Sequence, residues 1–158
     1  MEKMHWKSKL FIVIGVALIA LILYLVYAHK SMVNDLKDQL VQTENDAWIR
    51  NNVDGYDKLF EPDCTLHIIA QPDLHGVEAL KQSVKAFHTA VAIIYFHIDD
   101  IFTADDKIVE RYTWQGKLNK NGNLVNISGC VIYKMKSNKI TEAWNYEDTY
   151  TYFQSLGM

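Results

Sequence analysis

The residues best placed for chemistry lie in the last strand-like segment of the chain. Every second position there is occupied by Glu142, Trp144, Tyr146 and Asp148. In an extended chain such residues project from one face. A carboxylate beside aromatic rings is typical of a small-molecule pocket, and burial there would raise the pKa of Asp148 toward the range useful for acid/base catalysis. The alternative is that Trp144 and Tyr146 are ordinary core residues and Asp148 is a solvated strand end or helix N-cap.

Two basic residues are candidates to complete such a site. His67 lies in the middle of another strand-like segment, and pairing with Asp148 would make an acid/base dyad. Arg111 and Thr113 share a strand parity, and if they face inward Arg111 would hold a substrate oxyanion or keep Asp148 ionised. Each has a plainer alternative: His67 is a satisfied histidine on an outer face, and Arg111 is an exposed cross-strand partner of an acid.

Several classes of function find no support in the composition. Residues 29–158 hold 13 Lys and Arg against 18 Asp and Glu, which argues against a nucleic-acid surface. No HExxH, CxxC, Gly-rich phosphate loop or serine-elbow motif occurs, so we expect neither a metal nor a cofactor. Cys64 and Cys130 match no zinc or redox spacing. They are either free thiols packed as small apolar residues or, if the domain is extracytoplasmic, a disulfide.

A membrane anchor is predicted near the N-terminus. Residues 10–28 form an uncharged run of 19 residues, enough for a helix to cross a hydrocarbon core of about 30 Å. Residues 1–9 carry three lysines, so the positive-inside rule keeps this end cytoplasmic and the domain extracytoplasmic. Residues 29–37 would form a stalk before a domain at 38–158. The alternative is a signal peptide cleaved near Ala28, which would leave a secreted protein.

The rest of the sequence changes from helical to alternating periodicity. Ser31 can cap a helix, because apolar residues recur at helical spacing after it, and the same spacing occurs again near Tyr56 and from Val77 to Val91. Strand-like segments follow or intervene at 64–70, 94–103, 107–118, 124–136 and 139–148. Helices first and strands later indicate an α+β domain, in which a strongly curved antiparallel sheet wraps around the N-terminal helices.

Several short motifs, taken in order, carry a family resemblance. They are Pro62-Asp63, His75-Gly76-Val77-Glu78-Ala79-Leu80, Asp105-Asp106-Lys107-Ile108-Val109, Asn138-Lys139-Ile140 and Leu156-Gly157, with Phe87, Gly116, Gly129 and Gln154. Over about residues 38–157 the chain resembles the SnoaL-like polyketide cyclases of the nuclear transport factor 2-like superfamily. This resemblance implies a cone-shaped fold with a pocket, and it makes Asp148 the acid/base carboxylate. The chain departs from the family at Gly116-Lys117-Leu118, where the family often has a histidine.

The leading hypothesis is a membrane-anchored domain that binds a small, largely apolar molecule in its cone pocket, with cofactor-free cyclase, isomerase or dehydratase activity. In this hypothesis Asp148 and His67 are catalytic. The substrate-binding residues are Arg111, Trp144, Tyr146, Thr113 and Phe87. The alternative is a non-catalytic module of the cell envelope, which binds a ligand, forms a homodimer through its sheet or docks another protein.

Overall fold

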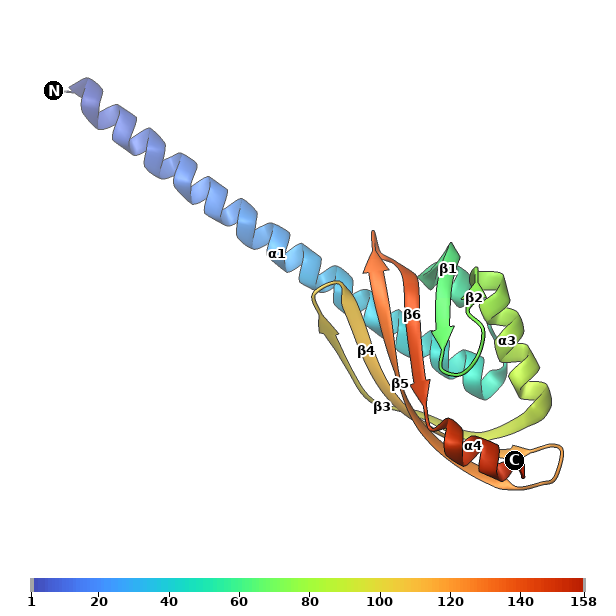
Figure 1. The fold of residues 1–158 in the computed structure, drawn as a ribbon. Coiled ribbons are helices and arrows are strands. Elements are labelled where there is room, and N and C mark those ends of the chain that lie inside the picture. The colour runs from blue at the N-terminus through green and yellow to red at the C-terminus, as the bar shows by residue number, and fades with distance from the viewer. Residues whose placement is uncertain (1, 158) are drawn as a thin grey trace. The chain divides into compact units, whose positions relative to one another are not determined.

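The computed structural model describes residues 2–157. Its elements are α1 (Glu2–Arg50), α2 (Tyr56–Leu59), β1 (Phe60–Ile68), β2 (Leu74–His75), α3 (Val77–Ala90), β3 (Val91–Ala104), β4 (Lys107–Leu118), β5 (Leu124–Lys136), β6 (Lys139–Glu147) and α4 (Thr149–Ser155), as Figure 1 shows. Most of the helical residues precede the long strands. The predicted α+β class is therefore confirmed.

The first helix is longer than its two predicted parts. One continuous helix runs from Glu2 to Arg50, so the predicted helix start at Ser31 is wrong. Its N-terminal part is long and apolar enough to be a candidate membrane span, and most side chains from Leu10 to Tyr27 are exposed. Two compact units divide the chain, one ending at Asp35 and the other beginning at Leu36. The side chains of Lys3 and Lys7, which enter the prediction of orientation, lie outside the described residues.

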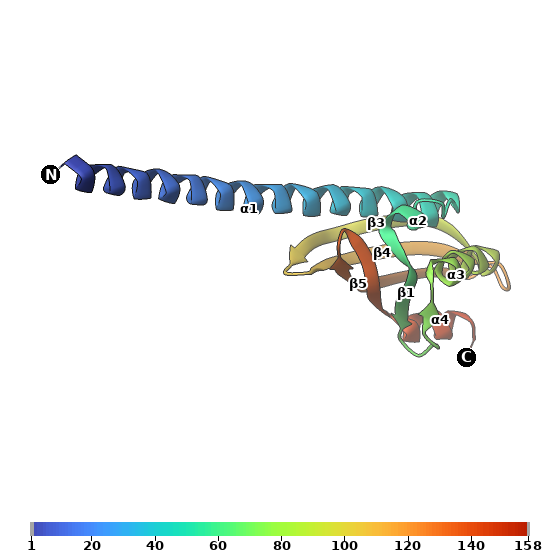
Figure 2. The same cartoon turned by 90° about the horizontal axis from the view of Figure 1, so that it is seen from above.

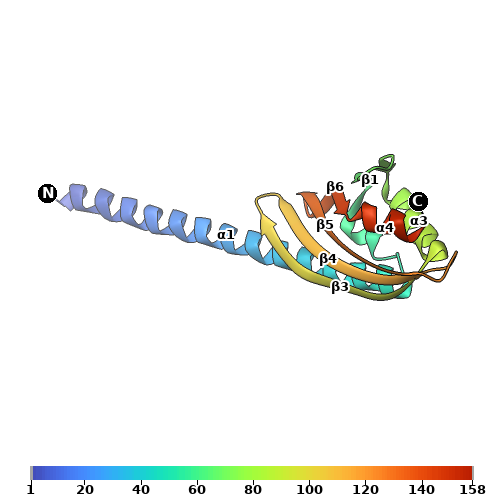
Figure 3. The ribbon, with the colours of Figure 1, turned by 60° about the horizontal axis from the view of Figure 1, so that its bottom comes forward.

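The six strands form one sheet in the order β2-β1-β6-β5-β4-β3. The strands from β3 to β6 pair as antiparallel neighbours, but β1 pairs with β6 in parallel, so the sheet is mixed rather than purely antiparallel. Local alternation of residues defines a strand but not the direction of a partner 77 or more residues away, which is why the sequence missed this pairing. Register shifts interrupt β3 at two places, and such bulges bend a strand. Figures 2 and 3 show β3 and β4 following a pronounced curve.

The concave face of the sheet carries the core of the domain. Along β4, the even-numbered residues from Ile108 to Leu118 are buried and the odd-numbered ones are more exposed. The end of α1 covers this face, because Leu40 and Ala47 pack in one cluster with Ile108 of β4. Helix α3 covers another part of the same face of the sheet. The helices and the sheet therefore enclose an interior that is lined by residues of both.

One glycine determines where a large interior side chain lies. Gly129 of β5 stands opposite Tyr112 of β4, and a Cβ added at Gly129 would lie 2.4 Å from the Tyr112 ring. No side chain fits in that space. The tyrosine ring therefore lies across β5, and its hydroxyl reaches β6, where Asn145 accepts its hydrogen bond.

Candidate functional site

The interior of the domain contains two adjoining chambers. The small chamber, of about 60 Å³, lies between the end of α1, α2 and the sheet and includes Glu44 and Glu110. The large chamber, of about 340 Å³, extends toward α3 and α4 and includes Glu147. Trp48, Tyr112 and Asn145 line both chambers. These three residues therefore lie at the boundary between the two chambers.

Ordinary periodicity brings the polar residues of the pocket together. Glu44 lies one helical turn from Leu40 and one from Trp48, so it shares their inward face of α1. Glu110 occupies the buried parity of β4 between Ile108 and Tyr112. On β6, Asn145 and Glu147 are one strand repeat apart and line the large chamber together.

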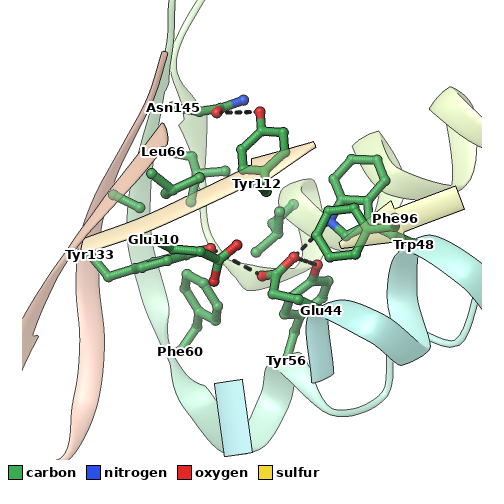
Figure 4. Close-up of a pocket in the computed structure, with 13 residues that line it drawn as sticks. Glu44, Trp48, Tyr56, Phe60, Leu66, Phe96, Glu110, Tyr112, Tyr133 and Asn145 are labelled. Carbon is green, nitrogen blue, oxygen red and sulfur yellow. Dashed lines mark hydrogen bonds between the residues drawn. The ribbon is translucent and has the colours of Figure 1, made fainter. Parts of the chain in front are cut away.

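Glu44 is a buried carboxyl group with three hydrogen-bond donors. Its Oε2 accepts from Trp48 Nε1 at 2.6 Å and from the Tyr56 hydroxyl at 3.2 Å, and its Oε1 accepts from the Tyr133 hydroxyl at 3.3 Å (Figure 4). Burial raises the pKa of Glu44 to about 7, although these three hydrogen bonds lower it. The group therefore changes protonation near neutral pH.

Glu110 lies beside Glu44 in the small chamber, and Figure 4 shows the two carboxyl groups directed toward one another. Only 1% of Glu110 is exposed, and among the described residues no hydrogen-bond partner reaches its Oε2. Burial, and then the charge of Glu44, raise the pKa of Glu110 well above its ordinary value. Because it is costly to ionise two adjacent buried carboxyl groups, Glu110 favours its protonated form.

Glu147 is the carboxyl group of the large chamber. Burial raises its pKa, against the hydrogen bonds of Tyr112 and Trp114, which lower it. The Tyr112 hydroxyl lies 2.9 Å from Asn145 Oδ1 and 3.4 Å from Glu147 Oε2. A hydroxyl has a single proton, which Tyr112 donates to Asn145. The Tyr112 oxygen can then accept a hydrogen bond from the protonated form of Glu147 through the longer contact. The group is thus a half-buried acid among aromatic rings, able to release or accept a proton beside the open part of the chamber.

Asp148 does not lie in either chamber, so the premise of a buried Asp148 is wrong. It is exposed and forms the N-cap of α4, where its Oδ1 accepts from the Thr151 amide at 3.0 Å and its Oδ2 from the Thr151 hydroxyl at 2.6 Å. These hydrogen bonds, from the hydroxyl and then the amide, lower its pKa. The environment expected for Asp148 is found one residue earlier, at Glu147.

The other predicted residues of β6 share a face, as expected, but that face is the outer one. His67 stacks on Trp144 with ring centroids 5.5 Å apart, while Tyr146 is exposed. His67 contacts Glu142 through Nε2 and Asp73 through Nδ1, each at 3.0 Å, and its pKa is raised by these partners. The predicted pairing of His67 with Asp148 is therefore wrong.

Arg111 and Thr113 also face outward. Both contact Asp99 Oδ2, Arg111 at 3.0 Å and Thr113 at 2.8 Å. Arg111 is therefore an exposed cross-strand partner of an acid, as the alternative interpretation of this residue predicted. Phe87 is the one predicted site residue that lines the large chamber, where its ring meets Trp114 edge-on at 5.3 Å. A contact of Phe87 with a substrate stays a prediction. The two cysteines are free thiols.

The sequence carried signals for the residues that were missed. The Tyr112 and Trp114 parity of β4 is the more apolar one, and Glu110 is the carboxylate on it. Similarly, Glu44 lies midway between Leu40 and Trp48, so it shares their face of the helix. A carboxylate at a core position of an amphipathic element is rarely fully buried without a reason, so it marks a site more reliably than one at a strand end.

The family described as SnoaL-like polyketide cyclase matches residues 38–156. TsrD from Streptomyces laurentii is similar in structure, with 17% identity, a TM-score of 0.66, and coverage of 80% of this chain and 96% of that chain. A protein named as a candidate polyketide cyclase from Acidithiobacillus ferrooxidans has 24% identity, a TM-score of 0.63, and coverage of 77% and 94% respectively.

A protein named as a candidate isomerase from Bacillus subtilis has 11% identity, a TM-score of 0.66, and coverage of 77% of this chain and 95% of that chain. At such identities the structural similarities show the fold alone. No curated protein matches the sequence. The family match covers most of the chain and agrees with the fold, a curved sheet around a pocket of the kind that binds small molecules. The chain belongs to the SnoaL-like polyketide cyclase family.

Proposed function

We propose that the domain binds a small, largely apolar molecule in the large chamber, where Glu147 acts as a cofactor-free acid or base. The volume of about 340 Å³ lies within the range of small-molecule sites, about 300–1,000 Å³. Phe87, Trp114 and Tyr152 offer aromatic contacts, and Tyr112 and Asn145 offer a few polar ones. This composition fits an apolar molecule with one polar group directed toward β6.

The raised pKa of Glu147 inside this chamber is the observation that carries the proposal. A carboxyl group with a raised pKa is a stronger base when ionised than one in water, and it can also return a proton. With the side-chain amide of Asn145 in the same chamber as a hydrogen-bond donor to a carbonyl oxygen, Glu147 could take a proton from the neighbouring carbon. Cyclase, isomerase and dehydratase reactions all include such a step.

The probe for this proposal is 2-tetralone, an apolar bicyclic ketone whose carbonyl activates neighbouring protons. We expect the full chain in detergent to bind it and to accelerate deuterium exchange at those carbons in D₂O, as measured by NMR. Glu147→Gln should retain binding and lose the acceleration, because an amide cannot accept the proton. Asp148→Asn is the matched control, since it makes the same change on an exposed side chain one residue away.

A second pair of variants tests the chamber itself. Ser83 lines the large chamber, whereas Ala86 lies on the same helix and is exposed. Ser83→Phe should abolish 2-tetralone binding by filling the space, and Ala86→Phe should not. Binding unaffected by Ser83→Phe would refute the chamber as the binding site. Binding without any exchange above that in buffer would refute the catalytic role and leave a binding module.

The apolar part of α1 supports a further part of the proposal, a single-pass anchor with the domain outside the cytoplasm. The lysines in residues 1–9 favour this orientation. After alkaline extraction of cells, the full chain should stay in the membrane pellet, and a variant that lacks residues 2–30 should not. A soluble wild-type product that begins near His29 would instead support cleavage of a signal peptide.

The second candidate function is self-association through the outer face of the sheet. Tyr95 of β3 and Tyr146 of β6 are 45% and 49% exposed there, which favours a contact surface. Trp114 and Tyr133 are each 3% exposed and belong to the core, so they do not contribute to this surface. If the domain is a dimer, light scattering should give twice the protein mass, and Tyr95→Lys should halve it.

A further inference from the structure

The small chamber contains chemistry that the proposed function does not use. Glu44 already accepts three hydrogen bonds, so its oxygens are largely occupied. Glu110 is the opposite case, because its buried Oε2 has no partner among the described residues. A buried carboxyl oxygen without a partner costs about 1–3 kcal/mol, so its retention at the centre of a core calls for an explanation.

The walls of this chamber offer no positive charge to the two carboxyl groups. Of the described residues that line it, none is Lys, Arg or His. Burial raises the pKa of both carboxyl groups, and the charge of Glu44 raises that of Glu110 further. A cation brought by a ligand would supply the missing partner and allow both groups to ionise.

The aromatic residues of the small chamber are suited to such a cation. Trp48 and Phe96 stack with centroids 6.0 Å apart, and Phe60 meets Tyr56 edge-on at 5.5 Å and Tyr133 at 6.2 Å. Aromatic faces carry partial negative charge and attract ammonium groups, particularly where water is excluded. The chamber thus combines two carboxyl groups with several rings, as Figure 4 shows.

The size and donor set separate an organic cation from a metal ion. A cavity of about 60 Å³ has room for about four water-sized atoms. Calcium and magnesium prefer six or more oxygen ligands, whereas the described residues contain no group of three or more His, Cys, Asp or Glu that could hold a metal. A small amine needs fewer partners and gains from the rings.

We propose that the small chamber binds a small organic ammonium group, with the Glu110 carboxyl group as its hydrogen-bond acceptor, Glu44 as the second negative charge, and the surrounding aromatic rings as its cage. Trp48, Tyr112 and Asn145 line both this site and the large chamber, so the two sites are adjacent. The inference goes beyond the proposed function and does not require the acid/base role of Glu147.

The test compares two probes of equal shape, isopropylammonium chloride and 2-propanol, with the full chain in detergent at pH 8 and constant ionic strength. Ligand-observed NMR titration should give an affinity for the cation at least about tenfold higher than for the alcohol. Glu110→Gln should remove that preference while leaving the alcohol unaffected. Asp148→Asn should leave both affinities unchanged, since that carboxylate is exposed on α4.

Glu44→Gln is the second variant, which tests the other carboxyl group if Glu110→Gln does not fold, as judged by tryptophan fluorescence. Equal affinities for the two probes, or a cation preference that survives both substitutions, would overturn the proposal. The outcome is separable from that of the proposed function. Loss of the cation preference with intact 2-tetralone binding affects this inference alone, and the reverse result affects the large chamber alone.

Discussion

Replacement of Glu44 by glutamine should remove a large part of the pH dependence of stability. Burial raises the pKa of Glu44 from 4.5 to about 7, so between these values the folded chain holds a proton that the unfolded chain has released. The free energy of unfolding therefore falls as the pH rises through this interval. For a pKa that moves from 4.5 to about 7, the loss is about 3 kcal/mol.

Glutamine is a suitable replacement because it keeps the shape and most of the hydrogen bonds. Its single carbonyl oxygen can accept from Trp48 and Tyr56, which both donate to the same oxygen of Glu44. The amide nitrogen then faces the Tyr133 hydroxyl, which can rotate and accept. Glu44→Gln should thus be close to the wild type in stability at pH 5 and more stable by about 3 kcal/mol at pH 8.

The assay is urea unfolding of the full chain in detergent at pH 5, 6, 7 and 8, followed by tryptophan fluorescence. The wild-type slope alone is not sufficient, because the raised pKa values of Glu110, Glu147 and His67 also make stability fall as pH rises. The difference between wild type and Glu44→Gln reports the titration of Glu44 together with its effect on Glu110, whose pKa the charge of Glu44 raises. Glu78→Gln is the control, an exposed carboxylate on α3. Parallel curves for wild type and Glu44→Gln, within about 0.5 kcal/mol, would refute the reasoning.

Three other changes have defined outcomes. Glu110→Leu should raise the free energy of unfolding by about 1–3 kcal/mol, because it removes a buried acid with an unpartnered oxygen; a loss in urea unfolding would contradict this. Glu142→Gln should lower the pKa of His67 toward its ordinary value in an NMR titration of the imidazole, since Glu142 is the main cause of its increase. Gly129→Ala should destabilise the domain by about 1–3 kcal/mol and displace Tyr112, with weaker 2-tetralone binding as the second readout; unchanged binding and stability would show that the ring moves freely.

The sequence predicted most of the sheet because alternation is a local property. The strands at 107–118 and 124–136 agree with β4 and β5, and the helix predicted from Val77 agrees with α3 to within one residue. The break expected at Ser31 was wrong because a good cap residue can also continue a helix. The parallel pairing of β1 with β6 depends on contacts far apart in the chain, which no local period encodes.

The site was harder to predict, since alternation separates two faces but does not say which one is inside. On β6, aromatic Trp144 and Tyr146 made their parity look like the interior. The structure instead buries Ala143 and directs Asn145 and Glu147 into the pocket. A shift of one residue moves every side chain of a strand to the other face. The wrong assignment of the inward-facing parity of β6 therefore changed the whole candidate site.

The electrostatics of the domain follow the same division between interior and surface. The surface carboxylates Glu142 and Asp148 have lowered pKa values because hydrogen-bond donors favour their ionised forms. Glu44, Glu110 and Glu147 have raised pKa values because burial disfavours theirs. Since an apolar residue at any of these three positions would avoid the cost of burial, their presence on three different elements around the two chambers favours the proposed roles of these chambers over a role in the stability of the fold.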